Sequence, residues 1–227
     1  MESARSAVLF DMDGVLVFTE TLKANAHVAT IEQMGGAASI DLYIQMLGQS
    51  HEIIRTAYMQ AAGLSADPIL YTKQYRKIYH DLLERKLVIR PGAQELVREL
   101  HRHNFLRAVV SSSSSASVAK ILEKMGLQDG FDVQVTSDEV VGRKPDPAPY
   151  RLALEKLGVQ ASNAVVLEDS PSGIESAVRA GTHVIAVRHD YNRDLNFEAA
   201  ESIIESFSDV RSVVEIVSKS LKRDRQE

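Results

Sequence analysis

The sequence predicts an α/β fold in which a parallel β-sheet carries helices on both faces, with a block of helices inserted after the first strand. Three observations predict it. Short apolar runs without polar alternation recur along the chain, as expected for strands covered on both faces. Segments with a helical spacing of apolar residues separate the later runs. Between residues 17 and 87 this alternation stops, and only helical segments are apparent.

The expected strands are five short apolar runs, at residues 7–10, 106–110, 133–135, 164–167 and 184–187. Apolar residues three or four positions apart predict helices around residues 93–100, 118–125, 150–157 and 174–178. A residue that favours the left-handed conformation follows each of these helices, which is a common way for a helix to end: Asn104, Gly126, Gly158 and Gly181. Because strands that alternate with helices are joined by crossover connections, the sheet is expected to be parallel.

The inserted helical block is expected to span residues 17–87, so that residues 1–16 and 88–227 form the α/β core. Glycines at Gly35-Gly36 and a break near residues 63–68 divide the block into several helices. The block follows the carboxyl end of a strand, which is where ligands bind in open α/β sheets. It is therefore interpreted as a lid that selects the substrate, and a helical insert without such a role is the alternative.

Composition and charge exclude several classes of protein. The chain has 227 residues, of which 44% are hydrophobic and 25% charged, as in ordinary globular proteins. Its formal net charge of −5 argues against binding to nucleic acid or to anionic membranes. With no cysteine, it has no disulfide, thiolate metal site or cysteine nucleophile. The apolar run at residues 8–10 is too short for a signal peptide, and no run could span a membrane, so the cytoplasm is the expected location. A monomer is the expected oligomeric state.

Two acidic pairs each end an expected strand. Asp11 and Asp13 follow the first strand, and Gly14 lets the chain turn there. Glu168 and Asp169 follow the strand at residues 164–167. Solvated acids in a turn, or a helix cap at Asp169, are the plainer interpretations of each pair taken alone.

A serine run and a lysine also follow expected strands. Ser111, Ser112 and Ser113 follow the strand at residues 106–110 and precede a helix, where hydroxyl and amide groups suit a phosphate. Lys144 lies in a loop stiffened by prolines and can present a fixed cation. Either feature alone is weak, since serine caps and Lys-Pro loops are common.

Taken together, these features predict one site. The carboxyl ends of parallel strands lie on the same edge of a sheet, so all four segments are expected to meet there. Two like charges about 4 Å apart repel by roughly 4 kcal/mol at an effective dielectric near 20, so such an acidic cluster needs a cation or a shifted pKa. Oxygen ligands suit Mg²⁺. Carboxylates, Mg²⁺, a lysine and amide donors are the groups that phosphoryl transfer requires.

At this point the sequence resembles the haloacid dehalogenase-like (HAD) superfamily, and within it the capped subgroup of β-phosphoglucomutase and phosphoglycolate phosphatase. The resemblance covers nearly the whole chain. Its motifs are Asp11-Met12-Asp13-Gly14-Val15, Val109-Val110-Ser111, Lys144-Pro145-Asp146-Pro147 and Leu167-Glu168-Asp169-Ser170. It implies a Rossmann-like core with an inserted helical cap, Mg²⁺ as cofactor and a small phosphorylated metabolite as substrate.

The resemblance also implies roles for the core residues. Asp11 would be the nucleophile that accepts the phosphoryl group, and Asp13 the general acid and base. The phosphoryl oxygens would be held by Ser111, with Ser112 beside it, and by Lys144. The metal site would comprise Asp11, Asp13 through its carbonyl, and Asp169, with Glu168 in or next to it.

The cap residues Lys23, Gln49 and His51 are candidates for substrate binding, and ordinary surface residues are the alternative. Relative to the mutases, this chain has His51 where they have an arginine and Leu47 where they have a lysine. These departures favour a phosphatase that hydrolyses a small phosphomonoester over a phosphosugar mutase. A phosphate-binding regulator without turnover is the interpretation from another class, disfavoured because all the motif residues for catalysis are present.

Overall fold

The computed structural model describes residues 5–65 and 67–223, except for the side chain of residue 223. The chain forms two compact units. The first, which we call the core unit, runs to Phe18 and resumes at Ile89, and the second, the helical unit, comprises Thr19–Val88. The sequence predicts these boundaries at 16/17 and 87/88.

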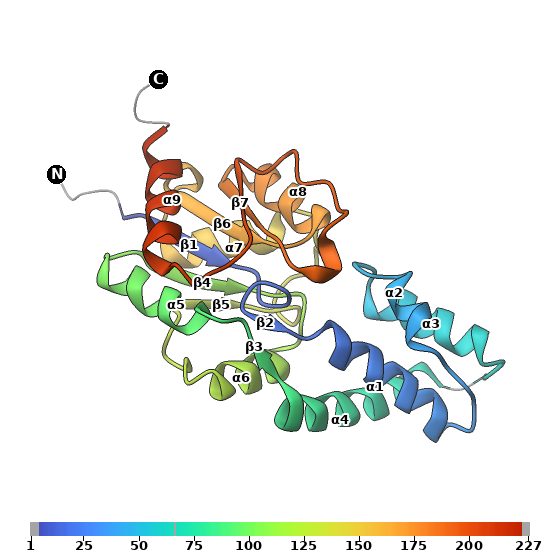
Figure 1. The fold of residues 1–227 in the computed structure, drawn as a ribbon. Helices are drawn as coiled ribbons and strands as arrows, with labels where there is room; N and C mark the ends of the chain where they lie inside the picture. The colour runs from blue at the N-terminus through green and yellow to red at the C-terminus, as the bar shows by residue number, and fades with distance from the viewer. Residues whose placement is uncertain (1–4, 66, 224–227) are drawn as a thin grey trace. The chain divides into compact units, whose positions relative to one another are not determined.

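A six-stranded parallel sheet forms the centre of the core unit, in the order β5-β4-β1-β6-β7-β8 (Figure 1). The strands are β1 (Ala7–Phe10), β4 (Leu106–Val110), β5 (Val133–Val135), β6 (Ala164–Glu168), β7 (His183–Val187) and β8 (Ser202–Ile204). The five expected strands and their parallel pairing are therefore confirmed. The sequence patterns did not predict β8, because this three-residue edge strand has no continuous buried run: its Ile203 is 46% exposed.

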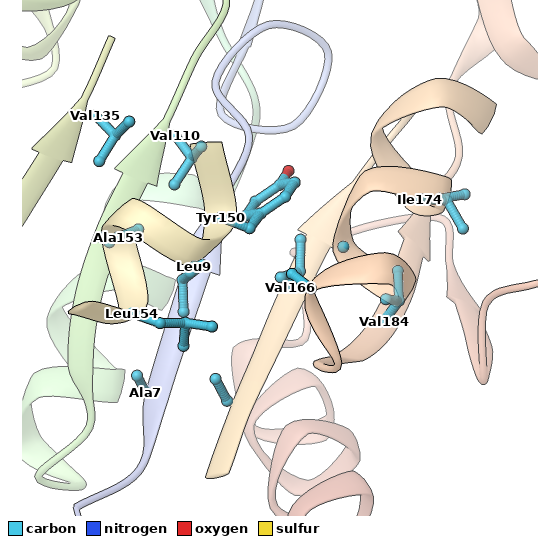
Figure 2. Packing of buried hydrophobic residues seen from close by; sticks show 14 of the residues in the cluster. Ala7, Leu9, Val110, Val135, Tyr150, Ala153, Leu154, Val166, Ile174 and Val184 are labelled. Atoms are coloured by element: carbon cyan, nitrogen blue, oxygen red, sulfur yellow. The ribbon is translucent and has the colours of Figure 1, made fainter. Parts of the chain in front are cut away.

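Helices cover the sheet in two pairs. On one face α7 (Ala148–Leu157) contacts α8 (Pro171–Ala180), and on the other face α5 (Ala93–Arg102) contacts α9 (Val210–Arg223). Figure 2 shows the first of these layers, in which Leu9 and Val166 of the central strands lie among side chains of α7 such as Tyr150. All of these side chains are buried, so the layer is a continuous apolar core beneath the carboxyl edge of the sheet.

The remaining core helices are α6 (Ser115–Lys124) and two short 3₁₀ turns, η1 (Ala161–Asn163) and η2 (Asp190–Asn192). The four predicted stop residues, Asn104, Gly126, Gly158 and Gly181, have φ values between 60° and 85°, as expected for left-handed helix ends. No helix in the described ranges combines the length and apolar character needed to cross a lipid bilayer.

The helical unit consists of α1 (Glu20–Gln33), α2 (Ile40–Ile44), α3 (His51–Ala61) and α4 (Pro68–Lys86). Its most extensive internal contact is between α1 and α4. Side chains cap three of these helices: Ser39 accepts from the amide of Asp41 at the start of α2, Ser50 from that of Ile53 at the start of α3, and Asp67 from that of Ile69 at the start of α4. The buried interior contains an aromatic cluster, in which Tyr79 stacks on Tyr75 and the ring of His27 lies near four tyrosine rings: Tyr43, Tyr58, Tyr71 and Tyr75.

Two short strands, β2 (Val17–Phe18) and β3 (Val88–Ile89), form a separate two-stranded sheet at the connections between the units. β2 lies within the range where only helices were expected. A two-residue strand is too short to produce a periodic pattern, which explains the difference.

Candidate active site

Asp11 and Asp13 lie where the chain leaves β1. The amide of Asp11 donates to the carbonyl of Leu167 at 3.0 Å, which extends the β1–β6 pairing and fixes the backbone of Asp11 at the sheet edge. Gly14 then turns the chain with a φ of 83°, in the region that favours glycine. Asp11 is 7% exposed, whereas Asp13 is half-buried.

Lys144 joins the two acidic segments. Its ammonium nitrogen Nζ donates to Asp11 Oδ1 at 2.5 Å, to Glu168 Oε1 at 2.7 Å and to the carbonyl of Val110 at 3.2 Å. Burial alone would lower the pKa of Lys144, but the carboxylates of Asp11 and Glu168 raise it well above its ordinary value. The side chain of Lys144 is therefore a fixed cation at this edge of the sheet.

Glu168 is fully buried, and both of its carboxylate oxygens accept hydrogen bonds. Oε1 accepts from Lys144 and from the hydroxyl of Tyr150 at 2.9 Å, and Oε2 accepts from the amide of Asp169 at 2.8 Å. Helix α8 approaches so closely that a Cβ on Gly173 would lie 1.7 Å from Oε1. These contacts hold Glu168 against Lys144, and its expected place in or next to the metal site stays a prediction.

Two serines from the turn between β4 and α6 contact Asp13. Oγ of Ser113 donates to Asp13 Oδ2 at 3.0 Å, and Oγ of Ser111 lies 3.4 Å from the same oxygen. The amide of Ser113 in turn donates to Oγ of Ser111 at 3.1 Å. Of the serine run noted in the sequence, Ser111 and Ser113 therefore lie at the site, whereas Ser112 is exposed on the turn.

Asp169 is held by the segment that follows β7. His189 Nε2 lies 2.9 Å from Asp169 Oδ2, and the side-chain amide of Asn192 donates to the carbonyl of Asp169 at 2.8 Å. Arg90 similarly donates to the carbonyl of Gly14 at 2.6 Å. Sequence reasoning missed these three residues. Only the position of His189 after an expected strand could have pointed to it, because parallel strands end at a shared edge.

Four carboxylates share this region with one lysine. Burial raises the pKa of Asp11, Lys144 opposes this effect, and Glu168, Asp169 and Asp13 raise it further. Such crowding of like charges favours an additional cation, and carboxylate oxygens are the donors that Mg²⁺ prefers. Among the described residues, no three acidic or histidine side chains form a ready-made metal site. The donors therefore fit a Mg²⁺ ion held by fewer side chains, together with main-chain oxygen or water.

The three candidate cap residues all belong to the helical unit. The ammonium of Lys23 lies 3.0 Å from Glu20 Oε1, and Gln49 is exposed. The ring of His51 lies against Tyr75, with the centroids 4.5 Å apart, so His51 is part of the aromatic cluster of this unit. A role for these residues in substrate binding stays a prediction.

Comparison with known proteins relates this arrangement to one family. The family model described as haloacid dehalogenase-like hydrolase matches residues 8–187. A phosphorylated carbohydrates phosphatase from Thermotoga maritima is 32% identical over 191 residues, which cover 82% of this chain and 87% of that protein.

Two crystal structures are similar over most of their length. A mutant of CbbY from Rhodobacter sphaeroides, in complex with xylulose-(1,5)bisphosphate, has 29% identity and a TM-score of 0.82 over 90% of this chain and 96% of that one. A Thermotoga maritima protein provisionally named a β-phosphoglucomutase has 29% identity and a TM-score of 0.79, over 93% and 99% of the two chains. The matched range includes every core motif residue from Asp11 to Asp169. The chain therefore belongs to the haloacid dehalogenase-like hydrolases, in the subgroup of phosphoglycolate phosphatases and β-phosphoglucomutase-like proteins.

Proposed function

We propose that this phosphoric monoester hydrolase is a Mg²⁺-dependent phosphatase that acts on a small phosphorylated metabolite through an aspartyl-phosphate at Asp11. The observation that carries the proposal is the position of Lys144, whose ammonium touches both Asp11 and the buried Glu168. A fixed cation beside a carboxylate at the sheet edge both orients that carboxylate and provides charge for phosphoryl oxygens.

In the first step, a carboxylate oxygen of Asp11 attacks the phosphorus atom of the substrate. The bond between phosphorus and the ester oxygen breaks, and protonated Asp13 donates its proton to the leaving oxygen. Ser111 and Lys144 hold the phosphoryl oxygens during transfer. The contacts of Ser111 and Ser113 with Asp13 Oδ2 support this proposal, because they limit the rotation of the Asp13 carboxyl group.

In the second step, ionised Asp13 takes a proton from water, and the water oxygen attacks the aspartyl-phosphate. The bond between phosphorus and the Asp11 oxygen breaks, which releases inorganic phosphate and regenerates the carboxylate. Asp13 therefore acts as acid and then as base within one turnover, and it ends the cycle protonated as it began.

The carboxylates of Asp11 and Asp169, with the main-chain carbonyl of Asp13, would hold Mg²⁺. When bound, Mg²⁺ supplies positive charge that offsets the crowded carboxylates and the charge of the phosphoryl group. Glu168 contributes indirectly, since it anchors Lys144 together with the hydroxyl of Tyr150.

The relatives support a sugar phosphate or a similar metabolite as substrate. One of them is named a phosphorylated carbohydrates phosphatase, and the CbbY structure contains a sugar bisphosphate. We assign selection of the substrate to the helical unit, with Lys23, Gln49 and His51 as the candidate contacts. The cytoplasm and a monomeric state, both expected from the sequence, remain predictions.

A phosphosugar mutase is the second candidate, because one similar structure is provisionally named a β-phosphoglucomutase. The two reactions differ in what accepts the phosphoryl group from Asp11: water in the hydrolase and a sugar hydroxyl in the mutase. The absence of an arginine at His51 favours the hydrolase, since a second phosphate is best held by a bidentate guanidinium.

A panel of phosphomonoesters tests the proposal. Phosphate release from p-nitrophenyl phosphate, sugar phosphates and phosphoglycolate is measured with Mg²⁺ and with excess chelator. We expect release that requires Mg²⁺ and returns when the ion is restored. A full rate in chelator would contradict the metal dependence, and isomerisation of a glucose phosphate without phosphate release would replace the hydrolase with the mutase.

A further inference from the structure

We propose that the segment after β7, residues 188–192, positions the carboxylate of Asp169 for Mg²⁺, with His189 as the residue that fixes its orientation. This inference deepens the proposed function and rests on it, because it concerns the same metal site. Neither His189 nor Asn192 belongs to the motifs of the resemblance.

The hydrogen bonds of His189 define its protonated nitrogen. Nδ1 accepts from the amide of Tyr191 at 3.2 Å, so the proton of the neutral ring is on Nε2. Nε2 lies 2.9 Å from Asp169 Oδ2 and therefore donates to it. The neutral imidazole is thus a directed donor to one oxygen of the carboxylate, which limits its rotation about χ2.

Asn192 holds the backbone of the same aspartate. Its side-chain amide donates to the carbonyls of Asp169 and Val187, at 2.8 and 3.0 Å, and its Oδ1 accepts from the amide of His189 at 2.7 Å. Asn192 is 2% exposed, so these bonds are shielded from water. One buried residue therefore links the ends of β6 and β7 and also fixes the start of the turn that carries His189.

Because Gly14 has no side chain, it leaves room for the side chains of Asp169 and His189. A Cβ on Gly14 would lie 2.0 Å from Asp169 Oδ2 and 3.0 Å from His189 Nε2. The ring of His189 also meets the ring of Phe18 edge-on, with the centroids 6.2 Å apart. The loop after β1, the end of β6 and the segment after β7 therefore converge on the Asp169 carboxylate, within the core unit.

An acid that binds a metal through one oxygen binds it more tightly when a second residue holds the carboxylate in place. Loss of such an outer contact typically weakens metal affinity by about 10- to 100-fold. His189 acts through Asp169, so we expect loss of its side chain to weaken the affinity for Mg²⁺. The fold and the binding of substrate at saturating Mg²⁺ should change less.

The experiment measures Mg²⁺ binding to the full-length, chelator-treated protein by isothermal titration calorimetry, without substrate. His189→Leu retains bulk but removes the donor, and we expect it to raise the dissociation constant about 10-fold or more. His189→Gln retains an N–H donor, and we expect it to restore affinity to within about 3-fold of the wild type. If the leucine variant does not fold, His189→Asn, whose shorter amide does not reach Asp169, is expected to show the same loss.

His183→Leu is the matched control. His183 is also a buried histidine paired with a carboxylate, since its Nδ1 lies 2.5 Å from Glu201 Oε1, but it begins β7 and lies at the opposite end of the strand. We expect this control to leave Mg²⁺ affinity within about 2-fold of the wild type, whatever its effect on stability.

The outcomes separate this inference from the proposed function. Equal affinity in the wild type and in the leucine and asparagine variants of His189 would overturn only the inference. A control variant that weakens Mg²⁺ binding as much as His189→Leu would also overturn it, because the effect would then be general. A wild-type protein that binds no Mg²⁺ would overturn the proposed function and this inference with it.

Discussion

The two units of this protein bury polar groups in opposite ways. In the core unit charged side chains are buried near the sheet edge: Lys144 contacts both Asp11 and Glu168, with Asp169 nearby. In the helical unit the buried polar groups are neutral, and comprise threonine hydroxyls, tyrosines and His27. Its central His27 is 1% exposed and bonds through Nδ1 to the hydroxyl of Tyr71 at 2.8 Å.

The pKa shifts of buried groups also differ between the two units. Burial, followed by the charges of His51 and Lys23, lowers the pKa of His27 to about 3, so the ring is neutral at physiological pH. In the core unit the pKa of Asp11 is instead raised by burial and by other acids, against the opposing effect of Lys144. The core therefore retains a crowded cluster of negative charges that a bound cation would relieve. The helical unit retains polar groups that need no ligand.

The buried charges of the core unit make this region costly to the stability of the fold. Buried charges with several like-charged neighbours reduce stability unless they are compensated, so their presence at the core edge indicates a selected site. The neutral cluster in the helical unit is instead explained by packing and hydrogen bonding alone.

Asp11→Asn should abolish turnover while preserving the fold, because the amide cannot act as the nucleophile. We expect a loss of about 10⁴-fold or more in kcat for any phosphomonoester. Steady-state kinetics and thermal unfolding check both parts. Retention of most of the activity would show that Asp11 is not the nucleophile.

Lys144→Met should reduce both activity and stability, because Asp11 and Glu168 would lose their shared cation. We expect about 3–5 kcal/mol less stability from the uncompensated buried charges and about 10²-fold or more lower kcat. Lys156→Met is the control, since Lys156 pairs with Glu139 in a half-exposed ion pair that should contribute less than about 1 kcal/mol. Urea unfolding of both variants checks the comparison, and similar losses would contradict it.

The stability of the helical unit should fall in mild acid because of His27. In the unfolded chain this histidine binds a proton below about pH 6.5, whereas in the folded unit it resists protonation down to about pH 3. The unfolded state therefore gains protons as the pH falls through this window. The expected loss from this residue between pH 7 and pH 5 is about 2 kcal/mol.

Five of the seven tyrosines lie in the helical unit and the chain has no tryptophan, so tyrosine fluorescence during urea unfolding reports mainly on this unit. His27→Phe retains an aromatic ring but removes the titrating group, and its stability should depend less on pH than that of the wild type. Identical pH profiles for the two proteins would be inconsistent with a buried neutral His27.

The smallest expected effect is at Gln49. Because this side chain is exposed, Gln49→Ala should leave stability within about 0.5 kcal/mol but raise KM for the preferred sugar phosphate by a few-fold. His51→Ala should also destabilise the unit, since the ring packs against Tyr75. Comparing KM for a sugar phosphate with KM for p-nitrophenyl phosphate checks the assignment, and an equal change for both substrates would count against substrate selection by Gln49.

The place of the candidate site at the sheet edge could be predicted because its acids follow apolar runs. Asp11 and Glu168 come at the ends of strands without polar alternation, and the ends of parallel strands meet at one edge. The partners of these acids could not be predicted. Glu168 contacts Lys144 and Tyr150, and hydrogen bonds of this kind depend on side-chain positions that no spacing in the sequence encodes.

The same limit applies to His189 and to the helical unit. His189 meets Asp169 across 20 residues of sequence, and His27 meets Tyr71 across 44. By contrast, α9 could have been predicted, because the buried Val213, Val217 and Leu221 recur every four residues. Local periodicity in the sequence can therefore predict helices, whereas contacts between distant segments are known only from the structure.

The most direct test of the account is to identify the residue that carries the phosphoryl group. The protein is mixed with Mg²⁺ and a phosphomonoester, quenched rapidly in acid during turnover, digested and examined by mass spectrometry. We predict phosphate on the peptide that contains Asp11, and none in the Asp11→Asn variant treated in the same way. Turnover with no phosphorylated peptide, or with the phosphate on another residue, would contradict the central claim.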